Sequence, residues 1–597
     1  MISRETQWRH RYGRFMFGLC VATLGTSAVC SAQTPTWMRT WDGARPGVTA
    51  PPRDVATGVL ANAAGNVYVL GMSLSNANTP VPPPLPPIPG RFLSHDDLAV
   101  VKLSPDGNVV WSLTYDFPTL GDSNVTPQTQ SGHDVPLEGV LGTDGSLYVL
   151  AQVAYRYDTG TVNVGNPPQP TETTIPAYGL GIVKISPSGS VVWSTIHFPS
   201  GVTSMNPISM ALGDSGRLYA AYSAITPSNG QTQGVLVVDS TAGTTVTDLM
   251  LNAAGASAFT LPRVVRPGTG GRVYVASTPP TSSGSSALLS VIDDATVSIV
   301  RETFAPGPVS RGIVGMVISP VDGSVAISGT VNGAGGGDAM AAKFTAAGDH
   351  LWTSTFDDIN SSSQAVAAGV AMDTAGNVYT AGIQGISPAP SDVFVVKFPS
   401  AGGAPAWGTV WSQASTSPEW VTSRQGIVVR PSGEVLVSGW LPGTASGSDF
   451  DMLALALNAD TGAVGTPIIY NPALSTASDD RVSAGMLLTP DGGLVLAGRS
   501  STSRNMDFVV VKFTVTSGTP AGCNPADIAG GGATGQSPDG SLDGTDFIAF
   551  INSFAIGDAS VDPAADVAGG GGDGLQPDGT IDGGDFIAFI NAFAIGC

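Results

Sequence analysis

The chain has 597 residues and a formal net charge of −21, and its 77 glycines and 45 prolines together make up about a fifth of it. This acidic excess argues against nucleic acid or anionic lipid as a partner and favours cations. The length exceeds what one ordinary core accommodates and suits a large repeat domain with a smaller module attached. The many turn residues favour short strands over helices.

The first 32 residues have the organisation of a secretory signal peptide. Four arginines between positions 4 and 14 precede a short apolar run over residues 15–28, and the small residues Cys30 and Ala32 follow at the −3 and −1 positions. A membrane anchor is the alternative interpretation, but the run is short and diluted by Gly and Thr. We therefore expect an exported protein, secreted or at the cell surface, with no membrane span in the mature chain.

Residues 33–515 contain one recurring unit. Its first half is an apolar strand, a turn with Gly and a second strand, as in residues 369–379. Its second half is a strand with Lys near its end, a turn and a strand led by Trp, as in residues 97–111. All five lysines of the chain occupy this one position in the unit: Lys102, Lys184, Lys343, Lys397 and Lys512.

Four strands per unit, in eight units, predict a mainly β fold in the form of a closed eight-bladed β-propeller. Seven blades are the alternative, because the third and fourth units are degenerate. The eighth unit lacks its Trp strand, whereas residues 37–42 match residues 111–116 in type. We therefore expect the N-terminal strand to complete the last blade. The units resemble the SBBP-type β-propeller repeats of bacterial exported proteins, and this resemblance implies a fold and no particular chemistry.

The recurring polar and aromatic residues have structural interpretations that we favour over ligand binding. We expect Trp to fill the gap between neighbouring blades. We expect Lys to pair with the Asp five residues before it or with an acid on the next blade. Polar residues that precede the first strands either cap turns or surround one mouth of a central channel; these are Asp54, His133, Asp134, Ser310, Arg311, Gln364, Asp480 and Arg481.

The tail, residues 516–597, has eleven Asp and no Lys, Arg or Glu from position 523 onward, in two copies offset by 39 residues. Closely spaced Asp with Gly at the turn, followed by an apolar helix, is the pattern of an EF-hand-like calcium loop, so we predict Ca²⁺ as the cofactor. The position-one ligand stays open in both loops, because Asp527 and Asp566 each stand twelve residues before the next loop Asp. The predicted ligands are Asp527, Asp539, Ser541, Asp543 and Asp546 in the first copy and Asp566, Asp578, Thr580, Asp582 and Asp585 in the second.

Two cysteines, Cys523 and Cys597, remain after signal cleavage and bracket the tail, which predicts one disulfide in an exported protein. The tail opens with Cys-Asn-Pro-Ala-Asp-Ile-Ala and ends in Gly-Cys, and with its paired loops it resembles a GC-type dockerin-like domain. That resemblance implies attachment to a cohesin-like or surface receptor protein through the duplicated helices. The predicted partner-binding residues are Phe547, Phe550, Ile551, Phe586, Phe589 and Ile590.

These features favour an exported, non-catalytic binding or display protein, in which the propeller is the cargo of a calcium-dependent docking module. Carbohydrate is a further ligand class for the propeller. The alternative is a propeller-type carbohydrate-active enzyme with its site at the channel mouth, which requires two carboxylates about 5–9 Å apart. The mature chain has few Glu residues and no Gly-x-Ser-x-Gly elbow, and its histidines are scattered.

Overall fold

The computed structural model describes most of the repeat region and parts of the tail. The described residues are 35–43, 54–74, 96–118, 134–164, 169–227, 231–251, 261–279, 283–333, 336–357, 364–385, 391–413, 419–422, 425–430, 432–443, 450–471, 479–502, 505–514, 528, 544–557, 565 and 580–595. They form 33 strands and two helices. The fold is therefore mainly β. The signal-peptide prediction and both predicted disulfide cysteines lie outside the described residues.

Six antiparallel four-stranded sheets follow one another along the chain, each in the order of its strands. The first three consist of β2 (Val55–Ala61), β3 (Val67–Leu74), β4 (Asp96–Leu103) and β5 (Val109–Tyr115); β6 (Val135–Leu141), β7 (Leu147–Val164), β8 (Gln169–Ile185) and β9 (Val191–His197); and β10 (Ser204–Leu212), β11 (Arg217–Ile225), β12 (Gln231–Asp239) and β13 (Thr245–Met250). The next three consist of β14 (Leu261–Pro267), β15 (Arg272–Thr278), β16 (Ser285–Asp293) and β17 (Ser298–Pro306); β18 (Ser310–Ile318), β19 (Val325–Gly333), β20 (Gly336–Phe344) and β21 (His350–Phe356); and β22 (Ala365–Met372), β23 (Val378–Gln384), β24 (Asp392–Phe398) and β25 (Trp407–Trp411).

The remaining strands form one nine-stranded sheet that consists of two groups. The first group is β26 (Trp420–Val421), β27 (Ile427–Val429), β28 (Glu434–Pro442), β29 (Phe450–Asn458) and β30 (Ile468–Tyr470). The second is β31 (Asp479–Leu488), β32 (Leu494–Thr502), β33 (Asn505–Phe513) and the N-terminal strand β1 (Trp37–Trp41). A single parallel residue pair, Phe450 with Asp479, joins the groups. Each group therefore has the layout of the other sheets, with the first strand of one group split into β26 and β27.

The N-terminal strand completes the last group. β1 pairs antiparallel with β33, and Trp37 lies opposite Lys512. The same Trp–Lys pairing occurs in the first sheet between Trp111 and Lys102, and it recurs in the second, fifth and sixth sheets. The prediction that residues 37–42 supply the missing Trp strand is confirmed.

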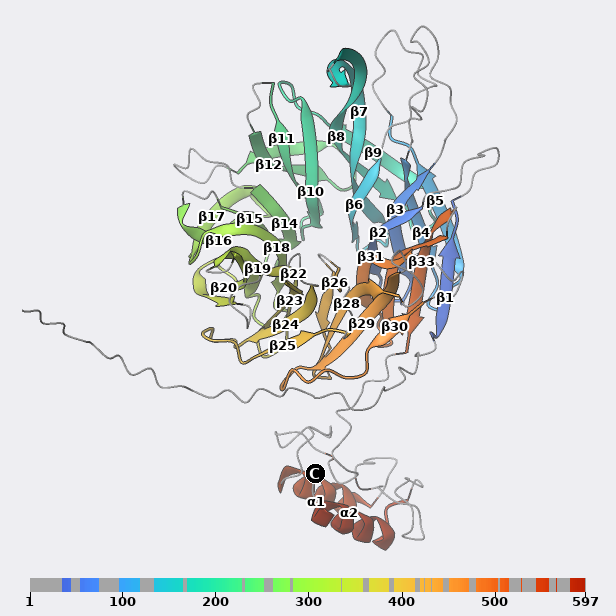
Figure 1. The fold of residues 1–597 in the computed structure, drawn as a ribbon, viewed down its shortest axis with the longest axis vertical. Coiled ribbons are helices and arrows are strands. Elements are labelled where there is room, and N and C mark those ends of the chain that lie inside the picture. Colours follow the sequence, from blue (N-terminus) through green and yellow to red (C-terminus); the bar gives the residue numbers. More distant parts are fainter. Residues whose placement is uncertain are drawn as a thin grey trace, which may run out of the picture.

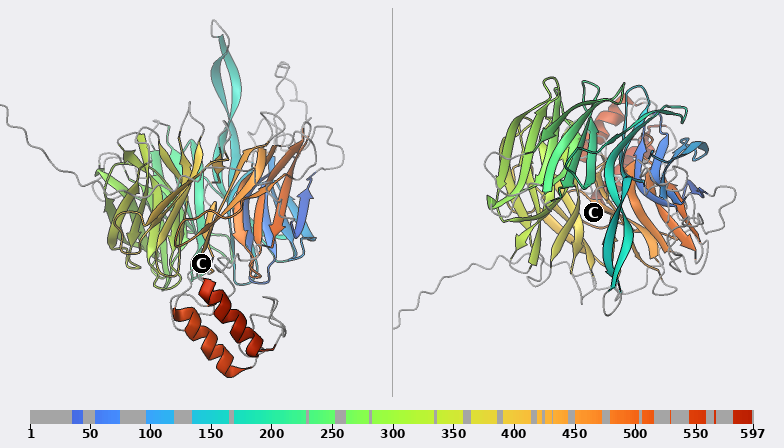
Figure 2. Two further views of the ribbon diagram at one scale, coloured as in Figure 1. Left: turned by 60° about the horizontal axis from the view of Figure 1, so that its bottom comes forward. Right: turned by 90° about the horizontal axis from the view of Figure 1, so that it is seen from above.

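The sheets are arranged around a common axis, and their first strands face it (Figure 1). The first strands of successive sheets contact one another, from β2 through β6, β10, β14, β18 and β22 to β27, and β31 contacts β2. The hydrophobic core lies between neighbouring sheets. For example, Leu70 on β3 and Val149 on β7 are both buried in one cluster between the first and second sheets. The hairpin of β7 and β8 extends beyond the other strands on one side (Figure 2).

The repeated Trp fills the space between sheets, as predicted. The indole N–H of Trp111 donates a 2.9 Å hydrogen bond to the carbonyl of Pro187, in the outer turn of the next sheet. Trp352 and Trp407 make the same contact with their next sheets, at 2.9 and 3.0 Å. In each of these turns a Gly with positive φ lies under the indole ring, where a Cβ atom would come within about 2.5–2.7 Å of it. Trp and Gly therefore form a repeated contact between sheets.

We expected Lys to pair with the Asp five residues earlier or with an acid on the next blade. The first pairing is wrong, whereas Lys397 lies 3.4 Å from Asp460 of the next group of strands, as the second requires. Five residues of extended strand span about 16 Å, which separates the two side chains. Instead the Lys343 ammonium donates to the carbonyl of Gly376 on the next sheet at 2.8 Å, and that of Lys397 donates to the carbonyl of Ala459 at 2.9 Å. Lys512 pairs with Asp491 of its own sheet at 2.6 Å. A buried ammonium group is thus compensated mostly by turn carbonyls.

Among the described residues, neither helix has the length and apolar character needed to cross a bilayer.

Candidate functional site

The tail contains two matching helices, α1 (Gly544–Ile556) and α2 (Gly583–Ile595). Each has a buried aspartate in its first turn, where a negative charge stabilises the helix dipole. An oxygen of Asp546 accepts a 2.8 Å hydrogen bond from the backbone N–H of Ile528, and an oxygen of Asp585 accepts one from the N–H of Asp582 at 2.8 Å. Asp585 therefore caps α2 through the residue just before the helix, whereas Asp546 ties α1 to Ile528.

Four of the ten predicted calcium ligands belong to the described residues, namely Asp546, Thr580, Asp582 and Asp585. The other six lie outside them: Asp527, Asp539, Ser541, Asp543, Asp566 and Asp578. The whole predicted donor set consists of oxygen atoms on a Gly-containing segment before a helix, and this chemistry suits Ca²⁺. Calcium binding by the tail remains a prediction.

The two helices pack through aromatic rings, and this assigns two predicted partner-binding residues to the core. Phe550 and Phe589 stack with ring centroids 3.9 Å apart and an interplanar angle of 13°, and both are fully buried. Phe554 and Phe586 flank the pair, with centroids 5.7 Å apart. Figure 2 shows α1 and α2 side by side. Because their side chains face the opposite helix, Phe550 and Phe589 hold the module together and offer no exposed surface.

An exposed apolar row remains on each helix. Phe547, Ile548 and Ile551 on α1 are 40%, 58% and 38% exposed. The equivalent residues of α2, which are Phe586, Ile587 and Ile590, are 40%, 59% and 37% exposed. Four of these residues were predicted to bind a partner, whereas Ile548 and Ile587 were not. The sequence feature that could have identified Ile548 and Ile587 is the 39-residue repeat, which places an isoleucine at this position in both copies.

The first strands also line a cavity of about 230 Å³ near the axis. Glu138 on β6 projects there, and its carboxylate pairs with the guanidinium of Arg266 on β14 at 2.7 Å. Its other oxygen accepts hydrogen bonds from the hydroxyl of Ser209 and the N–H of Met210. Both carboxylate oxygens are therefore engaged in a contact that joins the second, third and fourth sheets.

The acids before the first strands do not surround a channel mouth. Asp54, Asp134 and Asp480 are fully buried, so they cannot contact a ligand at the mouth. A carboxylate oxygen of Asp54 accepts a 2.7 Å hydrogen bond from the N–H of Gly43, and one of Asp134 does the same from Phe117. Both donors lie two residues beyond the outer strand of the preceding sheet, so the carboxylates cap the connection between sheets. This is the first of our two interpretations, in which these residues cap turns.

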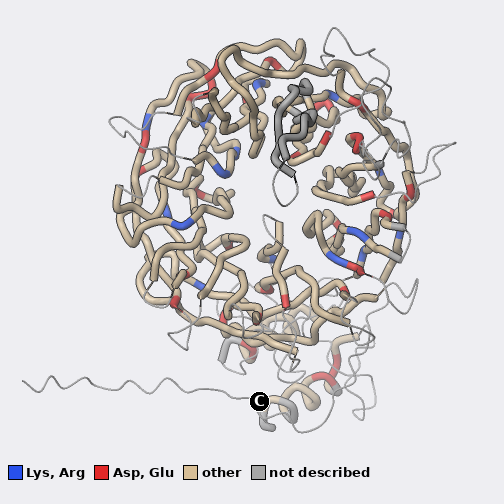
Figure 3. The backbone as a smooth tube through the Cα atoms, turned by 45° about the horizontal axis from the view of Figure 1, so that its top comes forward, with Lys and Arg blue, Asp and Glu red and all other residues tan. Residues whose placement is uncertain are grey.

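Burial changes the acidity of these groups. Desolvation raises the pKa of Asp54 to about 6 and that of Asp134 to about 8, against an ordinary value of 3.8. Glu419, which precedes the seventh unit and accepts from the N–H of Gln413 at 3.0 Å, has a pKa raised to about 7 by burial. Acidic residues are distributed around the whole circle of sheets (Figure 3).

No known family model matches this sequence, and no curated protein matches it. Solved structures with similar folds have little sequence identity. A periplasmic gluconolactonase of Pseudomonas aeruginosa is 12% identical, with 73% of this chain and 97% of that chain covered at a TM-score of 0.38. A europium-containing methanol dehydrogenase is 10% identical, with 81% of this chain and 94% of that chain covered at a TM-score of 0.42. The β-propeller domain of the Trilobed protease from Pyrococcus furiosus is 10% identical over 63% of this chain and 93% of that chain, with a TM-score of 0.32. The chain itself is built from repeated four-stranded antiparallel sheets.

Proposed function

We propose that the repeat region is a closed eight-bladed β-propeller that serves as exported cargo. Six four-stranded sheets, and two groups of five and four strands in the remaining nine-stranded sheet, support the number eight. Contacts between the first strands, including the contact of β31 with β2, support closure. The pairing of β1 with β33 supports a ring held at its junction by the two ends of the repeat region.

We further propose that the tail is a calcium-dependent docking module and that the protein has a binding or display role without catalysis. The observation that carries this proposal is the duplicated exposed apolar row on α1 and α2. Large apolar side chains gathered on one exposed surface mark a protein interaction site in a folded module. The row occurs at equivalent positions of both helices, so a partner would meet the same surface in either of two orientations.

Calcium would act through the loops that precede the helices. Several carboxylates within a few residues repel one another, and a bound divalent cation removes this repulsion. Asp546 and Asp585, in the first turns of the two helices, follow these loops in the sequence. The resemblance of the tail to a GC-type dockerin-like domain supports a cohesin-like or surface receptor protein as the partner.

Calcium titration of the full-length protein tests the first part. The variant carries Asp543→Asn and Asp582→Asn, which remove one charge from each loop, and Asp106→Asn on the first sheet is the matched control. We expect calorimetry to show a component of Ca²⁺ binding that is lost in the loop variant and kept in the control. Equal binding by all three proteins would contradict a calcium module in the tail.

Retention on the exporting cell tests the second part. We expect the protein to be released from the cell surface by a chelator and to return when Ca²⁺ is restored. The double variant Ile548→Ser and Ile587→Ser should fail to return although it binds Ca²⁺ normally. Retention that ignores both the chelator and the double variant would exclude docking through these helices.

A further inference from the structure

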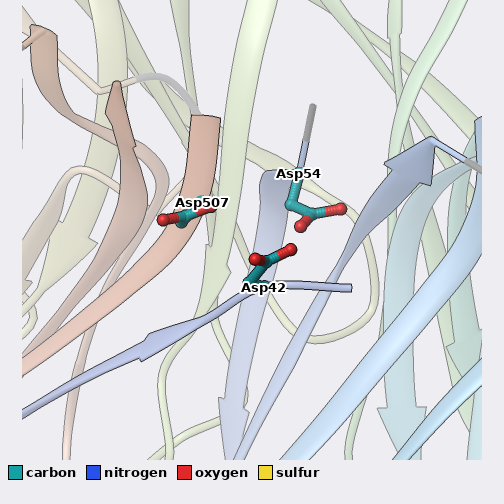
Figure 4. A group of neighbouring side chains, drawn as sticks. All are labelled: Asp42, Asp54 and Asp507. Carbon is teal, nitrogen blue, oxygen red and sulfur yellow. The ribbon is translucent and has the colours of Figure 1, made fainter. Parts of the chain in front are cut away.

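Three carboxylates from distant parts of the sequence meet where the first and last sheets join. Asp42 follows β1, Asp54 precedes β2, and Asp507 lies on β33. One oxygen of each carboxylate lies within 4.8 Å of the others. Figure 4 shows the carboxylates of Asp42 and Asp54 turned toward each other, with Asp507 beside them. The cluster thus involves the N-terminal strand, the final strand and the start of the first sheet.

A buried atom in the cluster lacks a partner. Asp54 is fully buried, and its Oδ1 atom accepts no hydrogen bond, whereas Oδ2 accepts from Gly43. Oδ1 of Asp507 is likewise buried without a hydrogen bond. Buried carboxylate oxygens are normally satisfied by hydrogen bonds, counter-charges or a metal. Repulsion from Asp42 and Asp54 adds to burial in raising the pKa of Asp507 to about 6.

We propose that Asp42, Asp54 and Asp507 bind one Ca²⁺ ion that links the N-terminal strand to the last and first sheets. Ca²⁺ takes oxygen ligands at about 2.3–2.6 Å, so two ligands on one ion can stand up to about 5 Å apart. The spacing of the three carboxylates fits this limit. The ion supplies the positive charge that three carboxylates need in a partly buried position. This site is separate from the calcium loops of the proposed docking module and does not depend on them.

Acidic residues occupy the corresponding positions at the next junction, although among the described residues only the first junction brings three carboxylates within 4.8 Å of one another. Asp134 precedes β6 as Asp54 precedes β2, and it is fully buried with an Oδ1 atom that accepts no hydrogen bond. Asp116 and Asp97 lie close enough to raise its pKa further. They occupy the positions of Asp42 and Asp507, one after the outer strand and one on the third strand. The repeat unit therefore places acids at equivalent positions of both junctions.

The geometry provides an optical probe of the first junction. Trp41 directly precedes Asp42, and its ring packs against Phe508 with centroids 4.9 Å apart. A Cβ atom placed on Gly43 would lie 2.8 Å from the Trp41 ring and 3.1 Å from Oδ1 of Asp54, so the ring lies close to the cluster. Tb³⁺ substitutes for Ca²⁺ in oxygen sites and emits when a nearby tryptophan is excited.

The test uses the full-length protein with its tail ligands removed by Asp539→Asn, Asp543→Asn, Asp578→Asn and Asp582→Asn. Failure of the docking proposal therefore cannot affect the result. At pH 7 we expect saturable Tb³⁺ emission that Ca²⁺ displaces. Asp54→Asn should weaken the affinity of the Trp41-sensitised component at least tenfold, since Asn keeps an oxygen for Gly43 but loses the charge. Trp41→Phe should lower emission severalfold without changing the remaining affinity.

Asp106→Asn, an exposed aspartate in an outer turn of the first sheet, is the control and should change neither quantity. Asp42→Asn provides a second variant at an exposed position should Asp54→Asn fold poorly, as judged by circular dichroism. Absence of tryptophan-sensitised emission overturns the proposal, because the carboxylates then share protons in place of the ion. Emission that survives Asp54→Asn or Asp42→Asn in folded protein also overturns it.

Discussion

The indole N–H of Trp37 donates a 2.9 Å hydrogen bond to the carbonyl of Pro105, although 68 residues separate them in the chain. Trp37 belongs to β1 in the last group of strands, whereas Pro105 lies in the outer turn of the first sheet. This contact is equivalent to those that Trp111 and Trp352 make with the sheets that follow them. The junction between the two ends of the repeat region therefore uses the same contact as the junctions within it.

Replacement of Trp37 should lower the free energy of unfolding. Trp37→Ala removes a buried aromatic side chain and should cost about 3–5 kcal/mol. Trp37→Phe keeps most of the ring but leaves the carbonyl of Pro105 without its donor, and should cost about 1–2 kcal/mol. Urea denaturation of both variants checks these values, with the half-exposed Val110→Ala as the control. Losses no larger than that of the control would show that β1 contributes little to the repeat region.

Replacement of the glycine under the indole ring of Trp37 should lower the free energy of unfolding. Gly107 has a φ of 78°, and a Cβ atom there would lie 2.5 Å from the ring of Trp37. Gly433 has a φ of 81° with no atom within 4 Å of an added Cβ, so Gly433→Ala measures the backbone cost alone. We expect Gly107→Ala to destabilise the protein by about 1–3 kcal/mol more than Gly433→Ala. Equal effects in urea denaturation would mean that the ring moves freely away.

Stability should depend on pH through the buried acids. Burial raises the pKa of Asp134 to about 8, so the folded state holds a proton that the unfolded state releases near pH 4. The free energy of unfolding should therefore fall as the pH rises from about 4 to about 8 in the presence of a chelator. At about 1.4 kcal/mol per pKa unit, the fall contributed by this group is on the order of several kcal/mol.

Asp134→Asn should flatten this dependence, because Asn carries no charge and still accepts a hydrogen bond from Phe117. Melting temperatures at pH 5 and pH 8 provide the measurement. Asp322 is the control. Hydrogen bonds from Ser319 and Ser324 lower its pKa to about 2, so Asp322→Asn should leave the trend between pH 5 and 8 unchanged. A wild-type protein that is more stable at pH 8 than at pH 5 without metal would contradict the assignment.

The sequence predicted the sheets better than the contacts between them. Strand order and the Trp–Lys register were predictable because they depend on short, repeated segments. The completion of the last group by residues 37–42 was predictable from the same repeat. The partner of Lys343 was not, because a turn carbonyl such as that of Gly376 has no signature in the sequence. The meeting of Asp42, Asp54 and Asp507 depends on the arrangement of whole sheets in space, which no local pattern specifies.

The two kinds of apolar residue on the tail helices should respond differently to substitution. Phe550 is fully buried against Phe589, so Phe550→Ala should destabilise the helical module by about 3–5 kcal/mol. Ile548 is 58% exposed, so Ile548→Ser should change its stability by no more than about 0.5 kcal/mol. Differential scanning calorimetry of the full-length variants, with Ca²⁺ present, should show a tail transition that moves in the first and stays in the second. A tail transition that moves equally in both would mean that Ile548 packs against another part of the same chain, and the exposed row would then be unable to serve as a docking surface.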